Sequence, residues 1–206
     1  MKRSFLVLTL ALVFLLMVSG IGSTMVMEKL VTIPTADMIT TKGYISGEIY
    51  NNEKKILEGI FLAHPRLEMG GMARLEKGED DPELGLNAKT VLVDETQYEP
   101  TVAAGVKMDD IYLVMSKSFG YGIRAHLGVG NGELGGVFAG VNKVFNPVQV
   151  EGDFQSGSSL PTINLMGEYI NDQINLGMRV DLQENLTLDF AVLDFDDLKL
   201  GLGFSF

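Results

Sequence analysis

Apolar and polar residues alternate along most of the chain after residue 42, and short turn sequences separate the alternating stretches. In residues 173–181, for example, the apolar Ile174, Leu176, Met178 and Val180 alternate with polar residues or glycine. Successive side chains of a β-strand point to opposite sides, so each stretch predicts a strand with one apolar and one polar face. The predicted strands are 43–51, 56–63, 66–76, 83–93, 100–108, 111–119, 121–130, 134–145, 161–170, 173–181, 185–193 and 197–206.

The links between these strands are mostly short and contain turn residues. Asn131-Gly132 is the strongest of these signals, because an Asn-Gly pair favours a short hairpin. Strands joined by such short links run antiparallel. The link 146–160 is an exception: if both ends of a barrel lie in the periplasm, this long link lies there too, where links are normally short.

Alternation alone does not say whether the apolar faces meet lipid or a dry core. Three features favour lipid: strands of a length that suits a tilted membrane crossing, polar faces rich in Gly, Ser, Thr and Asn, and apolar faces that almost never carry a charge. We therefore predict an all-β fold, an antiparallel up-and-down transmembrane β-barrel of about 10–12 strands. The alternative is a soluble periplasmic barrel or sandwich that binds an apolar ligand.

The chain ends on the alternating sequence LKLGLGFSF. In lipid a sheet cannot leave an edge unpaired, so the last strand is expected to close on the first. The pattern also resembles the carboxyl-terminal signature of bacterial outer-membrane barrels, and this resemblance implies recognition by the barrel-assembly machinery. The residues of this predicted assembly signal are Leu198, Leu200, Leu202, Phe204 and Phe206.

The amino-terminal end has the order of a secretory signal peptide. A basic head, Met1-Lys2-Arg3, precedes an apolar run and then small residues at 20–24. A membrane anchor, the alternative, usually needs about twenty apolar residues. The predicted organisation is a cleaved signal peptide at 1–22, a lead-in segment at 23–42 and a barrel at 43–206, which places the protein in the outer membrane by the secretory pathway.

Composition excludes several classes of function. The net charge of −11, with no basic stripe, argues against nucleic-acid binding. The absence of cysteine excludes disulfides and a lipid-modified amino terminus. Acidic residues gather at 76–83 and 194–197, but their spacing does not match the twelve-residue calcium loop. They are interpreted as solvated links, and no metal or other cofactor is expected.

Charged and polar residues on the polar faces are the candidates for lining the lumen. They would either line a conducting lumen or pair across a filled interior, and for a small barrel we favour pairing. These candidates are Glu68, Arg74, Lys89, Lys107, Arg124, His126, Glu168, Arg179 and Asp181.

Only His126 suggests catalytic chemistry, because Ser116 and Ser118 lie on the neighbouring strand. A serine nucleophile needs a histidine within hydrogen-bond reach and a third group that orients the histidine. A lipid-modifying barrel enzyme using His126 is therefore an alternative. We expect a non-enzyme in which His126 belongs to a polar network and His64 lies exposed in a turn.

Four stretches are similar to the YjbH-like family of outer-membrane barrels, which is associated with exopolysaccharide export. They are KLVTIPTADMITTKGYISG at 29–47, PRLEMGGMARLE at 65–76, PTVAAGVKMDDIYLVMSKSFG at 100–120 and HLGVGNGELGGVFAGVNKVF at 126–145. The resemblance implies a short, single-barrel relative with a structural, export or envelope role. The implied partners are outer-membrane lipid, the barrel-assembly machinery and polysaccharide-export components.

Overall fold

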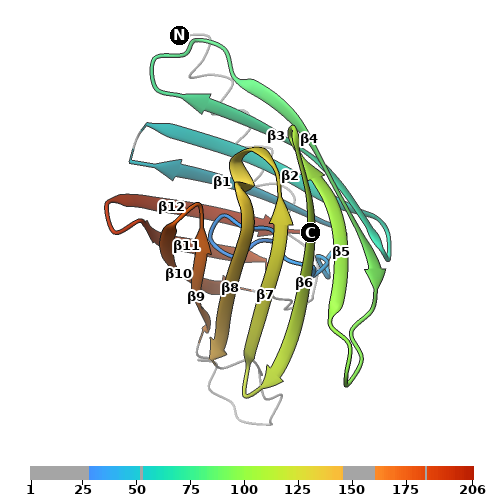
Figure 1. The fold of residues 1–206 in the computed structure, drawn as a ribbon. Helices are drawn as coiled ribbons and strands as arrows, with labels where there is room; N and C mark the ends of the chain where they lie inside the picture. Colours follow the sequence, from blue (N-terminus) through green and yellow to red (C-terminus); the bar gives the residue numbers. More distant parts are fainter. Residues whose placement is uncertain (1–27, 52, 146–160, 184) are drawn as a thin grey trace, which may run out of the picture.

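The computed structural model describes residues 28–51, 53–145, 161–183 and 185–206, which form one closed antiparallel barrel (Figure 1). Each strand pairs with the next in sequence, and β1 pairs with β12. The predicted fold class and strand order are confirmed, with twelve strands. The strands are β1 (Gly43–Tyr50), β2 (Lys54–His64), β3 (Leu67–Glu76), β4 (Glu83–Val93), β5 (Thr101–Lys107), β6 (Asp110–Gly120), β7 (Ile123–Gly130), β8 (Gly136–Phe145), β9 (Thr162–Ile170), β10 (Gln173–Gln183), β11 (Leu186–Leu193) and β12 (Asp197–Ser205).

The two ends of the barrel differ in their links. We call the end at which β1 stops and β2 starts the turn rim; its other links are 77–82, 108–109, 131–135, 171–172 and 194–196. The opposite end, the terminal rim, holds the start of β1, the end of β12 and the links 65–66, 94–100 and 121–122. The predicted signal peptide at 1–22 and the link 146–160 lie outside the described residues. β8 ends and β9 begins at the terminal rim.

The carboxyl-terminal strand closes the barrel, as expected for a sheet that cannot leave an edge unpaired in lipid. The register runs from Tyr44 opposite Ser205 to Tyr50 opposite Lys199. Beyond the strand, Gly43 and Phe206 exchange two backbone hydrogen bonds of 2.9 Å each. The last residue is thus held in the wall, and the described strands leave no open edge.

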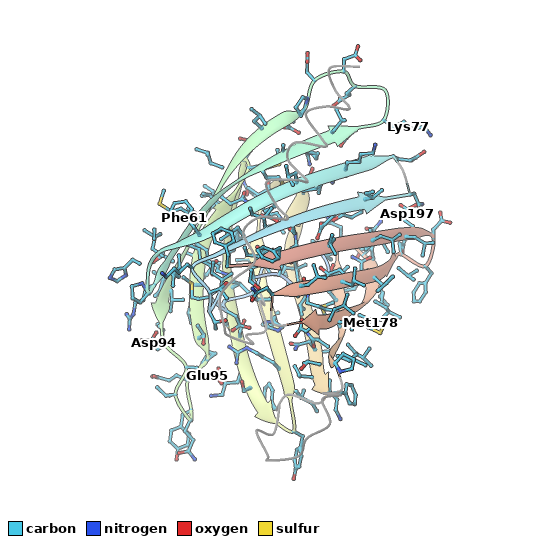
Figure 2. All side chains as sticks on the ribbon, turned by 180° about the vertical axis from the view of Figure 1, so that it is seen from behind. Phe61, Lys77, Asp94, Glu95, Met178 and Asp197 are labelled. Carbon is cyan, nitrogen blue, oxygen red and sulfur yellow. The ribbon has the colours of Figure 1, made fainter. Side chains whose placement is uncertain are left out.

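Large apolar side chains point outward from every strand. Figure 2 shows Phe61 and Met178 directed away from the barrel. Leu200 is 54% exposed, whereas Arg179, on the opposite face of the wall, is 1% exposed. One representative from each strand, in order, is Ile49, Leu57, Met69, Leu86, Val106, Leu113, Leu127, Val141, Leu165, Leu176, Phe190 and Leu200. The alternation read from the sequence therefore has its apolar face outside.

The link at Asn131-Gly132 is a hairpin connection, as predicted, but it covers residues 131–135 and not the predicted 131–133. It contains a short 3-10 helix, η1 (Gly132–Leu134), and β8 begins only at Gly136. Leu134 is buried with the interior apolar residues, and the Glu133 N–H donates to Asp110 Oδ2 at 3.0 Å. Burial of Leu134 requires the longer link, so the Asn-Gly pair marks a hairpin whose turn type it does not decide.

Residues 28–39 of the predicted lead-in segment lie inside the barrel, where Figure 1 shows them in blue within the ring of strands. We call these residues the plug segment. Their side chains and amides contact inward-facing residues from many strands around the wall, including Glu58 of β2, Ser116 of β6 and Glu168 of β9. Among the described residues, no helix is long and apolar enough to cross a membrane.

Candidate functional site: the plugged interior

The plug segment folds back on itself before it leaves the lumen. Lys29 and Pro34 form an isolated antiparallel bridge. Leu30 N–H donates to the Ile33 carbonyl at 3.0 Å, and Thr35 N–H donates to the Glu28 carbonyl at 3.2 Å. Within the part of the chain that the structure describes, the segment forms no strand ladder with the wall. It is therefore held by side chains and single hydrogen bonds.

An apolar cluster holds the middle of the plug segment. Leu30, Val31 and Ile33 are fully or almost fully buried in one cluster with the wall residues Val114 and Phe138. A Cβ at Gly140 of β8 would overlap Leu30 Cδ1, so the plug passes directly over this glycine. Part of the interior is thus apolar, which the assignment of polar residues to the inner face did not predict. The reason is that the apolar plug side chains need partners away from water.

Glu168 of β9 binds the turn of the plug segment. Its Oε2 accepts the N–H groups of Val31 and Thr32 at 3.0 and 2.9 Å, and that of Ile33 at 3.2 Å. The Thr32 hydroxyl donates to Oε1 at 2.5 Å, and Asn175 Nδ2 donates to the same oxygen at 2.9 Å. Consecutive backbone amides that point at one anion form a favourable nest. The plug backbone therefore compensates a carboxylate buried in the wall.

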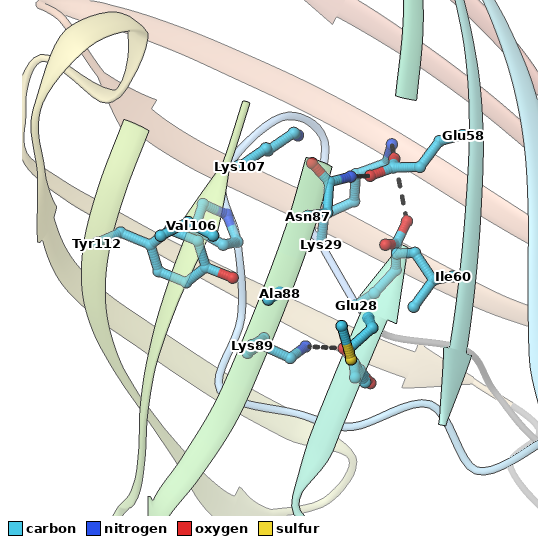
Figure 3. A pocket seen from close by; sticks show the side chains of 13 residues that line it. Glu28, Lys29, Glu58, Ile60, Asn87, Ala88, Lys89, Val106, Lys107 and Tyr112 are labelled. Atoms are coloured by element: carbon cyan, nitrogen blue, oxygen red, sulfur yellow. Dashed lines mark hydrogen bonds and ion pairs between the residues drawn. The ribbon is translucent and has the colours of Figure 1, made fainter. Parts of the chain in front are cut away.

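Lys29 fills a second binding position on the wall, beside β1 and β2. Its Nζ lies 2.8 Å from Glu58 Oε2 and 3.1 Å from Glu48 Oε1, and Figure 3 shows Lys29 next to Glu58. Lys199 of β12 lies 2.8 Å from the same oxygen of Glu48 and donates to the Val31 carbonyl at 2.6 Å. All these side chains are almost fully buried, so each charge depends on its partner.

Nearer the terminal rim, Asp37 pairs with Arg124 of β7. Arg124 Nε lies 2.9 Å from both carboxylate oxygens, and Nη1 lies 2.5 Å from Glu95 Oε2. Lys89 of β4 donates to the Asp37 carbonyl and forms an ion pair of 2.9 Å with Glu68 of β3. The two ends of the plug segment are thus fixed by opposite charges, Lys29 at one and Asp37 at the other.

A polar network joins the plug to four neighbouring strands. Ala36 N–H donates to Ser116 Oγ at 2.9 Å, and Ser116 Oγ lies 2.7 Å from His126 Nδ1. His126 Nε2 lies 3.0 Å from Asn142 Oδ1, and Asn142 Nδ2 donates to Asn164 Oδ1 at 2.9 Å. Because Asn142 Oδ1 can only accept, Nε2 carries the proton and Nδ1 accepts from the serine hydroxyl.

The Ser116–His126 pair foreseen in the sequence is therefore present, but it is covered. Ser116 is 0% exposed, and the plug backbone contacts its hydroxyl. A nucleophile for lipid needs access to the membrane face, whereas these side chains face the filled lumen. Ser118 does not contact His126 in this way: its Oγ accepts a hydrogen bond from Arg124 Nη1 at 2.5 Å. In this arrangement His126 positions the plug.

All nine lumen-lining candidates face the interior, and most of them are paired. Glu68 pairs with Lys89, Arg124 with Asp37, and Glu168 with the plug amides. Arg74 pairs with Glu83 and Glu133, and Arg179 pairs with Asp189. Lys107 lines one cavity beside Glu28 and another at the turn rim. Asp181 lies half-buried near Arg179.

Several interior residues were not among the predicted candidates. Glu48, Glu58, Asp189 and Lys199 occupy polar-face positions, so the same alternation would have found them. Lys29 and Asp37 carry no such signal, because they precede the first strand. Among the described residues, no group of acidic or histidine side chains is arranged to hold a metal ion.

Two cavities lie on either side of the plug segment. The one at the turn rim has a volume of about 700 Å³, and Lys29, Val31 and Thr32 form part of its lining. The one at the terminal rim has a volume of about 270 Å³, and Ala36, Asp37 and Met38 contribute to its lining. The plug segment therefore contributes to the walls of both cavities.

The wild-type barrel is expected to lose stability as the pH rises, and the Glu28→Gln variant is expected not to show this loss. Burial, followed by repulsion from Glu58, raises the pKa of Glu28 from 4.5 to about 7. Because the folded pKa is the higher one, the stabilisation is complete below about pH 4.5 and is lost as the pH rises through about 7. The shift corresponds to about 3 kcal/mol.

Urea unfolding of the refolded barrel at about pH 5 and about pH 8.5 measures this effect. The exposed Glu79, in the link 77–82, supplies the control Glu79→Gln, which should keep the wild-type pH dependence. If Glu28→Gln and the wild type lose the same unfolding stability between the two pH values, Glu28 is not the titrating group.

No family model matches the sequence, and no curated protein matches it. Among solved structures, the chain is similar in fold to the KdgM porin in complex with disordered oligogalacturonate, with a TM-score of 0.50 and 11% identity over 80% of this chain and 98% of that chain. A second structure of the KdgM porin gives 0.49 and 11%, over 80% and 98%. The Acinetobacter baumannii outer membrane protein Omp33 gives 0.47 and 11%, over 81% and 98%.

Proposed function

We propose that this chain is an outer-membrane barrel with an envelope role, closed across its lumen by its own plug segment. The carrying observation is the outward apolar band, to which all twelve strands contribute large exposed side chains. Soluble monomers rarely expose apolar patches larger than a few hundred Å². A soluble barrel that binds an apolar ligand would have the reverse orientation, with Leu200 inside and Arg179 outside.

Charges on the outer face support the same placement. Lys117 of β6 lies among outward apolar residues near the terminal rim, and its Nζ donates to the carbonyls of Gln97 and Glu99, both at 3.1 Å. Lys143 of β8, near the same rim, lies 5.2 Å from the centre of the Phe145 ring. Such lysines direct their charge toward water at the edge of the hydrocarbon layer.

The sequence supports proposals for how the chain reaches the membrane and which partners it has there. Residues 1–22 would direct export, and Leu198 to Phe206 would be recognised during barrel assembly. The resemblance to the YjbH-like family supports a link with exopolysaccharide secretion, in which export components would be partners. The likeness in fold to a porin solved with oligogalacturonate is in keeping with saccharides as neighbouring molecules.

Fractionation of cells that produce the protein tests the membrane proposal. The protein should resist carbonate extraction, appear with outer membranes, and migrate differently on gels before and after heating. Recovery in the soluble periplasmic fraction would overturn it. Loss of exopolysaccharide secretion on deletion of the gene, with restoration by the intact gene, tests the export role separately.

A further inference from the structure

We infer that the plug segment closes a through-going pore and that this pore, once the segment is withdrawn, conducts ions with a preference for cations. The inference rests on the proposed membrane barrel and adds an activity to it. The cavities of about 700 and 270 Å³ open on opposite rims, and plug residues line both. Withdrawal of residues 28–39 would join the two spaces into one water-filled path.

The plug can leave without opening the wall. Its internal backbone bonds, Leu30 to Ile33 and Thr35 to Glu28, lie within the segment itself. The first backbone bond from this part of the chain to the wall is the Leu62 N–H to the Lys42 carbonyl, beyond the plug. The β1–β12 seam begins at Gly43. Residues 42 and 43 therefore remain fixed while the plug segment moves.

The contacts of the plug are mostly of a kind that water can replace. Lys29 with Glu58, Asp37 with Arg124, and the amides with Glu168 are ion pairs or charge-assisted hydrogen bonds. Water and salt compete with such contacts once the lumen hydrates, because the higher dielectric weakens them. Two apolar clusters oppose withdrawal through burial, one around Leu30 and Ile33 and a smaller one in which Ile39 packs with Tyr44 and Ile60.

Withdrawal removes Glu28, Lys29 and Asp37 from the lumen, so the wall residues that they leave behind set the charge of the open path. Glu58 loses Lys29 and keeps the neutral Asn87 amide, while Glu168 loses three backbone amides and keeps the neutral Asn175 amide. Arg124, which loses Asp37, retains Glu95. Two carboxylates thus lose a directly bonded lysine or amide nest, and Lys107, which lines the same cavity as Glu58, is the cation that stays near them, whereas the arginine stays paired. An open lumen with uncompensated carboxylates attracts cations.

Planar-bilayer recording of the full refolded chain tests the inference. The wild type should be closed almost all the time, and deletion of residues 28–39 should give a lasting conductance. With a salt gradient across the bilayer, the measured reversal potential should then be displaced from zero toward the equilibrium potential of the cation. A variant that migrates as a folded barrel and stays as silent as the wild type would overturn the pore, and a displacement toward the anion would overturn the selectivity.

Glu168→Gln keeps the whole chain and removes only the charge that binds the amides. We expect its open fraction to rise about tenfold, the change that corresponds to about 1.4 kcal/mol. The matched control is Glu83→Gln, because Glu83 lines the turn-rim cavity and pairs with Arg74 without contacting the plug. Equal open fractions in these two variants would show that the Glu168 contact does not hold the gate.

Cysteine labelling gives a readout that does not depend on conductance, since the chain has no cysteine of its own. Ser116→Cys is covered by Ala36 and should react slowly with a membrane-impermeant methanethiosulfonate in the full chain and rapidly after deletion of 28–39. Ser118→Cys is exposed and should react in both backgrounds. Rapid labelling of Ser116→Cys in the full chain would show that the segment does not seal the lumen. Failure of the wild type to migrate as a folded barrel would instead count against the membrane proposal.

Discussion

Replacement of Arg179 by methionine is expected to lower the free energy of unfolding by about 3–5 kcal/mol, because it leaves a buried carboxylate without its partner. Arg179 of β10 is paired with Asp189 directly across on β11, with Nε at 2.6 Å from Oδ1 and Nη2 at 2.9 Å from Oδ2. Both side chains are buried, so water cannot take over the lost contacts. The measurement is a urea titration of the refolded barrel, in which the fraction of protein that keeps the folded gel mobility is recorded at each urea concentration.

The double variant Arg179→Met with Asp189→Leu is the matched control. Removal of both charges also removes the unpaired carboxylate, so most of the lost stability should return. A double variant no more stable than Arg179→Met would mean that the loss reflects packing or another contact of Arg179. A single variant that unfolds at the wild-type urea concentration would contradict the prediction outright.

Met178→Arg, one residue away on the same strand, is expected to lower the free energy of unfolding by about 2–4 kcal/mol, because it places a charge on the face that meets lipid. Met178 lies near the centre of β10 and points outward (Figure 2). An arginine there would have to lose its water in the hydrocarbon layer or distort the bilayer to keep it. Urea titration after refolding into lipid vesicles measures the cost.

Ile174→Arg supplies the comparison, because Ile174 shares the face and the strand but lies beside the turn 171–172. Near the interface the same substitution should cost only about 0–1 kcal/mol, since the side chain reaches water. The difference between the two positions is the diagnostic quantity. Small and equal effects at both would indicate that the outer face meets water, and the membrane assignment would then be wrong.

The positions of the strands were predictable from local pattern. Each predicted stretch overlaps one strand, with ends that differ by up to a few residues. Period-two alternation reports on the environment of each face, and a barrel wall has two very different faces. The same alternation placed Arg179 and Glu168 inside and Leu176 outside. The hairpin at Asn131-Gly132 was predicted, but its link is two residues longer than the predicted 131–133 and contains the buried Leu134.

The plug segment was not predictable in the same way. The residues before β1 show no strand period, and only the apolar Leu30, Val31 and Ile33 hint that this stretch is buried. Its partners are far away in sequence: Thr32 meets Glu168 across 136 positions, and Asp37 meets Arg124 across 87. No spacing rule links such residues, so neither contact could be read from the chain.

The sequence by itself determined the wall: which segments become strands, which face of each is apolar, and that the last strand must pair with the first. These properties follow from the alternation of side chains and from the need of every backbone group for a hydrogen bond. Only the tertiary structure decided what fills the lumen and which charges meet there. Those contacts arise when the closed ring brings residues that are distant in sequence within a few ångströms of one segment, and the alternation along the chain does not encode which of them meet.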